Sequence, residues 1–545
     1  MISVLHISYF AYRITSQIYP KSMKVWFVFW SVIAIIRITQ YALRTLNELK
    51  LREQMRFQVF TNGKVVNKFK LCGSYLFGTD GISIRRAKIT FKNGLIECEK
   101  PNLGTAGLAL LWPIDGFGRV LLPTTCLPER SQPYNLNVEI ARARLMQIID
   151  KREDWSFFDN IEDIEGMRKE GQDLFIQAIQ KITDAPLASK LADESLKKAI
   201  SFSEKLAIKQ AETLFDARGE IHGFGRGCFG CRVDPMQIYN SKYIEKLLDF
   251  FGFVTIPISW AQIESHKGSY DFSLVDACVK VLVKEKLAMS AGPLLRFSKE
   301  NLPKWLLRSG GGFEKIRETA YQFVSKVVAR YADDIHVWSV ISSLNMLNDF
   351  GFSFEQVLEM TRAANMAVKQ GSDRAMKIIE ISNPWGEYYA TNTDTIPPLV
   401  YMDMVVQSGI NFDAFGLAMR FGKNQSGMHI RDMMQISAIL DYFRPIAKPL
   451  YITDVEVPSQ NGGGSQQSEV AGVWHKEWDQ ARQEQWIEQF CKIALSKPFV
   501  DTVTYSHLSD AEDSTIANSG LLTDRLEPKK SFHTLKKLHD TIFNR

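Results

Sequence analysis

The C-terminal part of the chain, residues 221–545, alternates eight times between a short apolar segment and a longer segment with helical periodicity. Strands joined by helices form parallel sheets, and eight such units over this length fit a closed (β/α)8 TIM barrel. A doubly wound sheet is the competing fold, but no G-x-G-x-x-G motif follows a first strand, and the glycine-rich stretch at residues 223–230 does not open a helix. The eight predicted strands are Gly227–Val233, Phe253–Ser259, Leu287–Leu295, His336–Ser342, Lys377–Ser382, Phe412–Ala418, Pro449–Val455 and Asp501–Ser506.

Two differently patterned regions precede the predicted barrel. Residues 55–135 contain short apolar segments separated by turn sequences such as Asn62-Gly63, which predicts a β-rich, sandwich-like module. Residues 136–220 contain long segments of helical periodicity, which predicts a helical connector. The overall fold class is therefore α/β. Three aromatic residues of the β-rich module are candidates either for its core or for a sugar-stacking surface, namely Trp112, Phe117 and Tyr134.

Residues 1–54 form an N-terminal extension of different character. Its apolar run Val25–Ile36 would be about 18 Å long as a helix, which is short of the ~30 Å hydrocarbon core of a bilayer. Three interpretations stay open: an interfacial or short signal anchor, an extra helix packed on the body, or an untranslated segment with Met55 as the true start. The expected location is the cytoplasm, with membrane anchoring or export through this extension as the alternative.

The net charge of +5 comes entirely from the N-terminal extension. Residues 1–54 contain seven Lys and Arg and two Glu, so the other 491 residues carry 59 basic and 59 acidic side chains. A body with balanced charge lacks the electrostatic footprint of a nucleic-acid-binding protein, so we expect no nucleic acid partner. The seven Cys exclude a disulfide scaffold and favour a reducing compartment.

Aromatic and polar side chains occur together at the predicted C-terminal ends of the barrel strands. This end of a (β/α)8 barrel carries the functional residues. A sugar offers flat CH faces to aromatic rings and hydroxyl groups to polar side chains, so the pattern predicts an oligo- or polysaccharide partner. The side chains that we expect to bind it are Trp260, Trp305, Trp385, Arg420 and Tyr505.

The sequence ISWAQIESHKGSYDFS at residues 258–273 resembles the second-strand motif of glycoside hydrolase family 10, the endo-β-1,4-xylanases. Further resemblances follow in the family's order over residues 225–540. They imply the family's barrel and an O-glycosyl hydrolase ancestry, with xylan or a related β-1,4-glycan as ligand. The matching features are Trp260, Glu264, Gly268, Tyr270, Phe272, Gly292, Pro303-Lys-Trp305, HVWSVI at 336–341, FGLAMRF at 415–421, YITDVEV at 451–457 and TYSHLSD at 504–510.

The same resemblance implies that the catalytic positions have changed. The family's acid/base Glu and the Asn before it correspond to Ser343 and Ser342, and its nucleophilic Glu corresponds to Asp454. A serine hydroxyl does not protonate a leaving oxygen usefully at neutral pH, and Asp is one methylene shorter than Glu. The positions that bind sugar in the family are also changed, and they correspond here to Thr255, Ile256, Ser259, Pro293, Ala418, Arg420 and Ser506.

Other carboxylates are candidates for a rebuilt catalytic pair. Asp454 and Glu456 alternate with Val455, so both are expected on one face of the strand. Glu387 follows the fifth strand and is expected to overhang the barrel mouth. The competing interpretation is that Asp454 forms a structural ion pair with Arg420 from the neighbouring strand.

We expect no metal and no cofactor. Cys228-x-x-Cys231 has no second Cys pair or spaced His, so the two thiols are expected to be buried. Three functions stay open: a glycan-binding pseudoenzyme with lost catalytic carboxylates, an active O-glycosyl hydrolase with a rebuilt site, and a scaffold without a glycan ligand. The Gly/Ser/Gln stretch Asn461–Ser468 is expected to be a loop over the mouth, and Trp474, Trp478 and Trp486 are expected to brace it or to line a groove.

Overall fold

The computed structural model describes residues 55–101, 104–155, 158, 161–221, 223–461, 465–512 and 514–543. The N-terminal extension with its apolar run Val25–Ile36 lies outside these residues, so the interpretations of that segment stay predictions. None of the described helices is long and apolar enough to cross a membrane.

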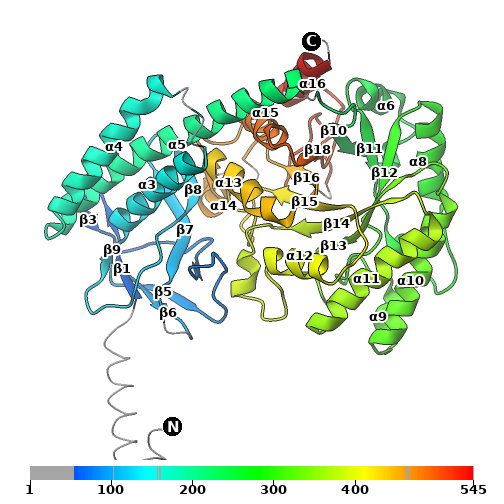
Figure 1. Cartoon of the computed structure of the whole chain (residues 1–545), viewed down its shortest axis with the longest axis horizontal. Coiled ribbons are helices and arrows are strands. Elements are labelled where there is room, and N and C mark those ends of the chain that lie inside the picture. Colours follow the sequence, from blue (N-terminus) through cyan, green and yellow to red (C-terminus); the bar gives the residue numbers. More distant parts are fainter. Residues whose placement is uncertain are drawn as a thin grey trace, which may run out of the picture.

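A closed barrel of eight parallel strands forms the larger part of the molecule (Figure 1). Each strand pairs with the next one, and β18 closes the ring by pairing with β10. The predicted (β/α)8 TIM barrel is therefore confirmed. The strands are β10 (Phe229–Arg232), β11 (Phe253–Ile256), β12 (Ala288–Ala291), β13 (Val337–Ser342), β14 (Met376–Ser382), β15 (Ala414–Arg420), β16 (Leu450–Glu456) and β18 (Val500–Tyr505).

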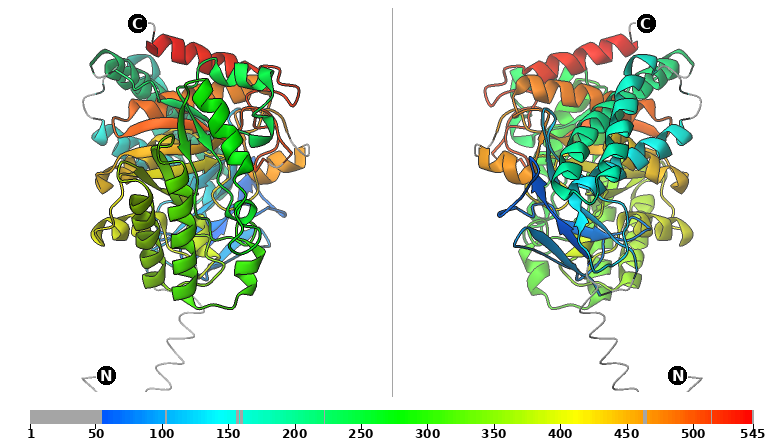
Figure 2. Two further views of the ribbon diagram at one scale, coloured as in Figure 1. Left: turned by 90° about the vertical axis from the view of Figure 1, so that its right-hand side faces the viewer. Right: turned by 90° about the vertical axis from the view of Figure 1, so that its left-hand side faces the viewer.

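Helices follow the strands and cover the outside of the barrel (Figure 2). Helix α10 (Phe313–Arg330) shows why they do so, because it buries Phe323, Val324 and Val327 on one face and carries charged residues on the other. The other helices of this part are α6 (Ser241–Leu248), α7 (Trp260–Ile263), α8 (Ser273–Lys284), α9 (Lys304–Arg308), α11 (Phe354–Gly371), α12 (Pro398–Gln407), α13 (Met433–Phe443), α15 (Gln480–Ser496) and α16 (Lys530–Phe543).

The β-rich region folds into two four-stranded sheets and a short hairpin. One sheet has the order β5-β6-β1-β9, and the other has the order β17-β8-β7-β4, in which β17 (Val473–Trp474) comes from the barrel segment. Trp112, Phe117 and Tyr134 are all buried, so they belong to the core and not to an exposed stacking surface. The strands of this region are β1 (Met55–Gln58), β2 (Phe60–Thr61), β3 (Lys64–Val65), β4 (Tyr75–Phe77), β5 (Lys88–Lys92), β6 (Leu95–Glu99), β7 (Gly107–Ile114), β8 (Gly118–Pro123) and β9 (Tyr134–Asn135).

Three long helices connect the β-rich region to the barrel: α3 (Leu136–Asp154), α4 (Glu162–Gln180) and α5 (Ala185–Ile221). Helix α5 lies along both parts and contacts α13 and α15 of the barrel (Figure 1). A buried ion pair joins α3 to the start of α13, with 2.5 Å between Arg144 Nη2 and Asp432 Oδ2. The connector therefore braces the barrel as well as linking it.

The segment after β16 differs from the loop that we expected at Asn461–Ser468. Residues 462–464 lie outside the described residues, and Ser465–Ala471 form helix α14. The residues after the glycine run include Gln, Glu and Ala, which favour helix over loop. Trp474, Trp478 and Trp486 are buried, and Trp478 also lines a cavity beside this segment, so both bracing and groove lining stay predictions.

Candidate functional site

A β-bulge on β16 brings two carboxylates to one guanidinium at the barrel mouth. The pairing of β15 with β16 passes from Leu417 opposite Ile452 to Ala418 opposite Asp454, which leaves Thr453 as the extra residue. Arg420 forms an ion pair with Asp454, and its Nε lies 3.4 Å from Oε1 of Glu456.

The charge of Asp454 is set by its surroundings. Burial raises its pKa, but the positive charges of Arg420, Arg232 and His507 and the hydrogen bond from Arg420 lower it, and the net shift is downward. Asp454 is 1 % exposed and is therefore a buried, ionised carboxylate. Its Oδ1 has no hydrogen-bond partner among the described residues. The structure thus shows the Arg420–Asp454 ion pair that the sequence offered as one of two interpretations.

Three residues contact Glu456: Ile516 and His507 from the segment after β18, and Arg420 from β15. Glu456 Oε2 accepts a hydrogen bond of 2.8 Å from the backbone N–H of Ile516, in the loop after β18. Its Oε1 lies 3.6 Å from Nε2 of His507 and also near Arg420. These contacts occupy both oxygens of Glu456.

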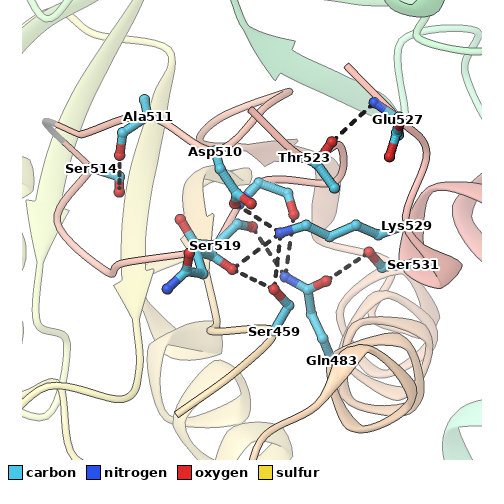
Figure 3. A network of polar contacts seen from close by, with 12 residues as sticks. Ser459, Gln483, Asp510, Ala511, Ser514, Ser519, Thr523, Glu527, Lys529 and Ser531 are labelled. Atoms are coloured by element: carbon cyan, nitrogen blue, oxygen red, sulfur yellow. Dashed lines mark hydrogen bonds and ion pairs between the residues drawn. The ribbon is translucent and has the colours of Figure 1, made fainter. Parts of the chain in front are cut away.

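A buried polar network holds the loop that carries Ile516 (Figure 3). Lys529 donates hydrogen bonds to Asp510 Oδ1 at 2.8 Å and to Ser459 Oγ at 2.9 Å, which joins the loops after β18 and β16. Gln483 of α15 donates to the carbonyl oxygens of Ser519 and Val457. Burial lowers the pKa of Lys529, and its ion pair with Asp510 offsets part of that shift. The network fixes this side of the mouth to the helix layer.

Two serines at the end of β13, Ser342 and Ser343, are joined to a carboxylate that the sequence did not single out. Ser342 Oγ donates to Oε1 of Glu380 at 2.6 Å, and Ser343 Oγ donates to Oγ of Ser382 at 2.6 Å. Arg296 Nη2 lies 3.2 Å from Ser342 Oγ and 3.5 Å from Glu380 Oε1. Ser342, Ser343 and Glu380 are buried, so this network is part of the floor of the mouth. A single acidic residue within the apolar segment Lys377–Ser382 is the signal that would have found Glu380.

A cavity of 570 Å³ opens beside this floor, between the loops that follow β10, β11 and β12. Trp260 lines it, but its indole is 2 % exposed, donates to Glu264 Oε2 at 2.9 Å and stacks on Phe323. The polar side chains of its wall include Arg232, Asp234, Ser259, Gln262, Asp271, Arg296 and Asn301. Its volume is typical of a small-ligand site.

Two other predicted binding residues have packing contacts. Trp305 donates its indole N–H to the backbone oxygen of Glu264 at 2.7 Å, and Tyr505 donates its hydroxyl to the backbone oxygen of Ser519 at 2.6 Å. Tyr505 is 3 % exposed. Both side chains support loops at the mouth, and a role in ligand binding stays a prediction for them.

Glu387 and Trp385 lie in a separate cluster. Glu387 forms a buried ion pair with Arg431 and accepts the backbone N–H of Gly427, and the Arg431 guanidinium lies 4.4 Å from the Trp385 ring centroid. Trp385 lines a different cavity, of 280 Å³, between the β-rich region and the barrel, together with Tyr75 and other residues. Among the described residues Glu387 has no contact with Asp454 or Glu456.

No group of three or more His, Cys, Asp and Glu within the described residues is arranged to hold a metal ion. Cys228 and Cys231 are both buried and free, as the lone C-x-x-C pattern predicts. Burial raises the pKa of Cys228 to about 12, so this thiol is not ionised at neutral pH.

No curated protein matches the chain significantly. Among solved structures, xylanase 10B from Thermotoga maritima is 16 % identical, covers 62 % of this chain and 99 % of its own, and has a TM-score of 0.45. Xylanase 10B from Thermotoga petrophila RKU-1, solved with xylobiose, is 16 % identical with coverages of 62 % and 97 % and a TM-score of 0.45.

These distant structures do not assign the chain to a protein family, but a family model does. The model of glycosyl hydrolase family 10 matches residues 222–537, which is more than half of the chain and includes every barrel strand. This match agrees with the order of motifs along the sequence and with the closed barrel. The chain therefore belongs to glycosyl hydrolase family 10.

Proposed function

We propose that the protein binds a β-1,4-linked saccharide of the xylan class at the barrel mouth and does not hydrolyse it. Family membership supports a saccharide ligand, and the 570 Å³ cavity lies at the barrel end where (β/α)8 proteins bind their ligands.

The observation that carries the proposal is how the polar side chains on the floor of the barrel mouth are paired with one another. A retaining glycosidase needs a protonated carboxyl as acid and a second carboxylate about 5–5.5 Å away as nucleophile. Here Ser343 stands at the acid position and donates to Ser382, while Asp454 and Glu456 share Arg420. A carboxylate whose pKa is lowered by a guanidinium does not serve as general acid at neutral pH.

One experiment tests binding and hydrolysis together. Xylotetraose is titrated calorimetrically into the protein, and release of nitrophenol from 4-nitrophenyl β-xylosides is followed in parallel. We expect saturable binding and no turnover above that of the Asp454→Asn variant. Gln262 is exposed and lines the cavity, so Gln262→Ala should weaken binding, whereas Gln407→Ala on the outer helix α12 should not.

An active hydrolase with a rebuilt carboxylate pair is the second candidate. The observation that favours it is the buried, ionised Asp454 with one oxygen that has no partner among the described residues. Hydrolysis that disappears in Asp454→Asn would establish this candidate and refute the first. Absence of both binding and turnover across a panel of β-1,4-glycans would leave a scaffold role.

A further inference from the structure

We propose that the mouth cavity recognises an acidic saccharide, a β-linked sugar that carries a carboxylate, through the guanidinium groups of Arg232 and Arg296. This inference rests on the proposed saccharide-binding function and names the class of sugar. It follows from how the charges of the mouth are paired, from which side chains line the cavity and from the hydrogen-bond geometry that guanidinium groups prefer.

Three arginines converge on the mouth, but only two of them have acidic partners. Arg420 is shared by Asp454 and Glu456, and Arg296 lies 3.5 Å from Glu380. Within the described part of the chain, Arg232 forms no ion pair within 4.0 Å, although its charge acts on Asp454 from farther away. A partly buried guanidinium without a counter-ion is an open binding site for an anion, because burial makes an unpaired charge costly.

Arg232 and Arg296 both line the 570 Å³ cavity, and each has a buried Nε that finds no acceptor among the described residues. Burial lowers the pKa of Arg296, while Glu380 offsets part of that shift, and the neighbouring Arg232 and Arg420 lower it further. The two guanidinium groups therefore repel each other across the cavity. A carboxylate placed between them would relieve this repulsion.

Among the described residues, the two acids in the cavity wall form no ion pair with Arg232 or Arg296. Asp234 accepts the backbone N–H of Met236 at 2.9 Å, and Asp271 accepts the backbone N–H of Ser273 at 2.9 Å. Both carboxylates thus serve the local backbone. The remaining polar wall residues, Ser259, Gln262, Ser273 and Asn301, are neutral groups that suit sugar hydroxyls.

A guanidinium binds a carboxylate through two parallel N–H···O hydrogen bonds, a geometry that a hydroxymethyl group cannot copy. The cavity should therefore distinguish a uronic acid from the neutral sugar that differs only at C6. Cellotetraose and its C6-oxidised counterpart, a β-1,4-linked tetrauronate, form such a matched pair.

The test is a calorimetric titration of the full chain with cellotetraose, the tetrauronate and xylotetraose, in low and high NaCl. We expect the tetrauronate to bind at least about tenfold more tightly than cellotetraose in 50 mM NaCl, because hydrogen bonds to charged groups are the stronger ones. This preference should shrink in 500 mM NaCl through ionic screening.

Arg232→Gln should abolish the preference for the tetrauronate. Arg232→Lys should leave a reduced preference, because Lys retains the positive charge but lacks the paired N–H donors of the guanidinium. Arg374→Gln is the matched control, because Arg374 is exposed at the opposite end of the barrel, just before β14. The control should keep the full preference. If Arg232→Gln does not fold, Arg296→Gln and the salt dependence of the wild type provide the same test.

Equal affinity for the tetrauronate and cellotetraose would overturn this inference and leave saccharide binding intact. Failure to bind any of the three oligosaccharides would overturn both proposals. Displacement of the tetrauronate by inorganic phosphate at equal concentration would also overturn the inference, since the cavity would then recognise an anion and not a sugar.

Discussion

Arg420 is the counter-charge of two carboxylates at the barrel mouth. It is nearly buried and lies between Asp454 and Glu456, so each charge at this point depends on the others. Burial lowers its pKa, but the charges of Asp454, Glu456 and Glu380 raise it, and the net shift is upward. The guanidinium is therefore charged at neutral pH.

Arg420→Met should destabilise the fold by about 3–5 kcal/mol, because it leaves two buried carboxylates without their counter-charge. Urea unfolding followed by circular dichroism measures this loss. Adding Asp454→Asn to Arg420→Met should recover part of it, since one of the two uncompensated charges is then removed. Strictly additive losses in the double variant would contradict this coupling.

His429 should make stability depend on pH below neutrality. It is 3 % exposed, burial lowers its pKa to about 4, and the neighbouring Glu387 is already paired with Arg431. The unfolded chain, with a His pKa of about 6.5, binds the proton first, so stability falls as pH drops from 6.5 towards 4. The loss should reach about 3 kcal/mol.

Urea unfolding at pH 7, 6, 5 and 4.5 tests this expectation for His429. The His429→Gln variant is the control, because Gln fills similar space and does not titrate. The difference in unfolding free energy between wild type and variant should shift against the wild type as pH falls. A difference that is constant across this range would show that His429 does not cause the loss.

At the residue scale, the sequence predicted the positions of some carboxylates at the barrel mouth and missed others. Asp454 and Glu456 were predicted on one side because strand residues alternate, and both do contact Arg420. Glu380 was missed because the sequence of an apolar strand does not tell which side chains point into the barrel. That becomes clear only when all eight strands are in place. Glu387 was placed over the mouth from its position after a strand, whereas its contacts are with Gly427 and Arg431.

At the scale of elements, helix α5 connects the parts of the molecule through one buried acid. Glu204 accepts the indole N–H of Trp474 at 2.6 Å and lies 2.7 Å from Nε2 of His475. It also accepts the backbone N–H of Met433 at the start of α13. A single carboxylate thus joins the connector to β17 and to a barrel helix.

Glu204→Ala should cost about 2–3 kcal/mol, because the buried donors of Trp474 and Met433 then lose their acceptor. Glu194→Ala removes an exposed acid from the same helix and should change stability by less than about 0.5 kcal/mol. Chemical unfolding of both variants measures the contrast. Equal losses in the two variants would show that the loss reflects the helix and not the buried contacts.

The same scale shows the limits of local sequence patterns. The eight barrel strands were predicted because each is a short apolar run beside a helix. Each run can be recognised from its own local sequence, without knowledge of its neighbours in the barrel. The parallel pairing of β1 with β9 and the insertion of β17 beside β8 were not predicted. These pairings join distant residues through main-chain hydrogen bonds, which leave no local signature.

At the scale of the whole molecule the barrel and the regions before it share one hydrophobic core. Residues of β1, β7, α5 and every barrel strand belong to the same buried cluster. The boundary at residue 221 that the sequence suggests therefore marks a change of pattern. We do not expect the molecule to separate into independent domains there.

Calorimetric unfolding of the full chain should accordingly show a single cooperative transition. Residues 221–545 expressed alone should melt at a lower temperature or aggregate, because the faces that pack on α5 and β8 become exposed. Two resolved transitions in the full chain, or an excised barrel with an unchanged melting temperature, would contradict this view.

Strand β17 belongs to the barrel segment but pairs with β8 of the β-rich region, and this has a consequence for how the architecture can be inherited. A recombination joint near residue 221 would leave that sheet with three strands and would turn β8 into an unprotected edge, which invites association with other chains. A foreign barrel grafted behind the same module would need its own seventh loop to supply the missing strand. We therefore expect the β-rich region and the barrel to be inherited together. Changes in the loop that carries β17 should be accompanied by changes in the sheet that contains β8.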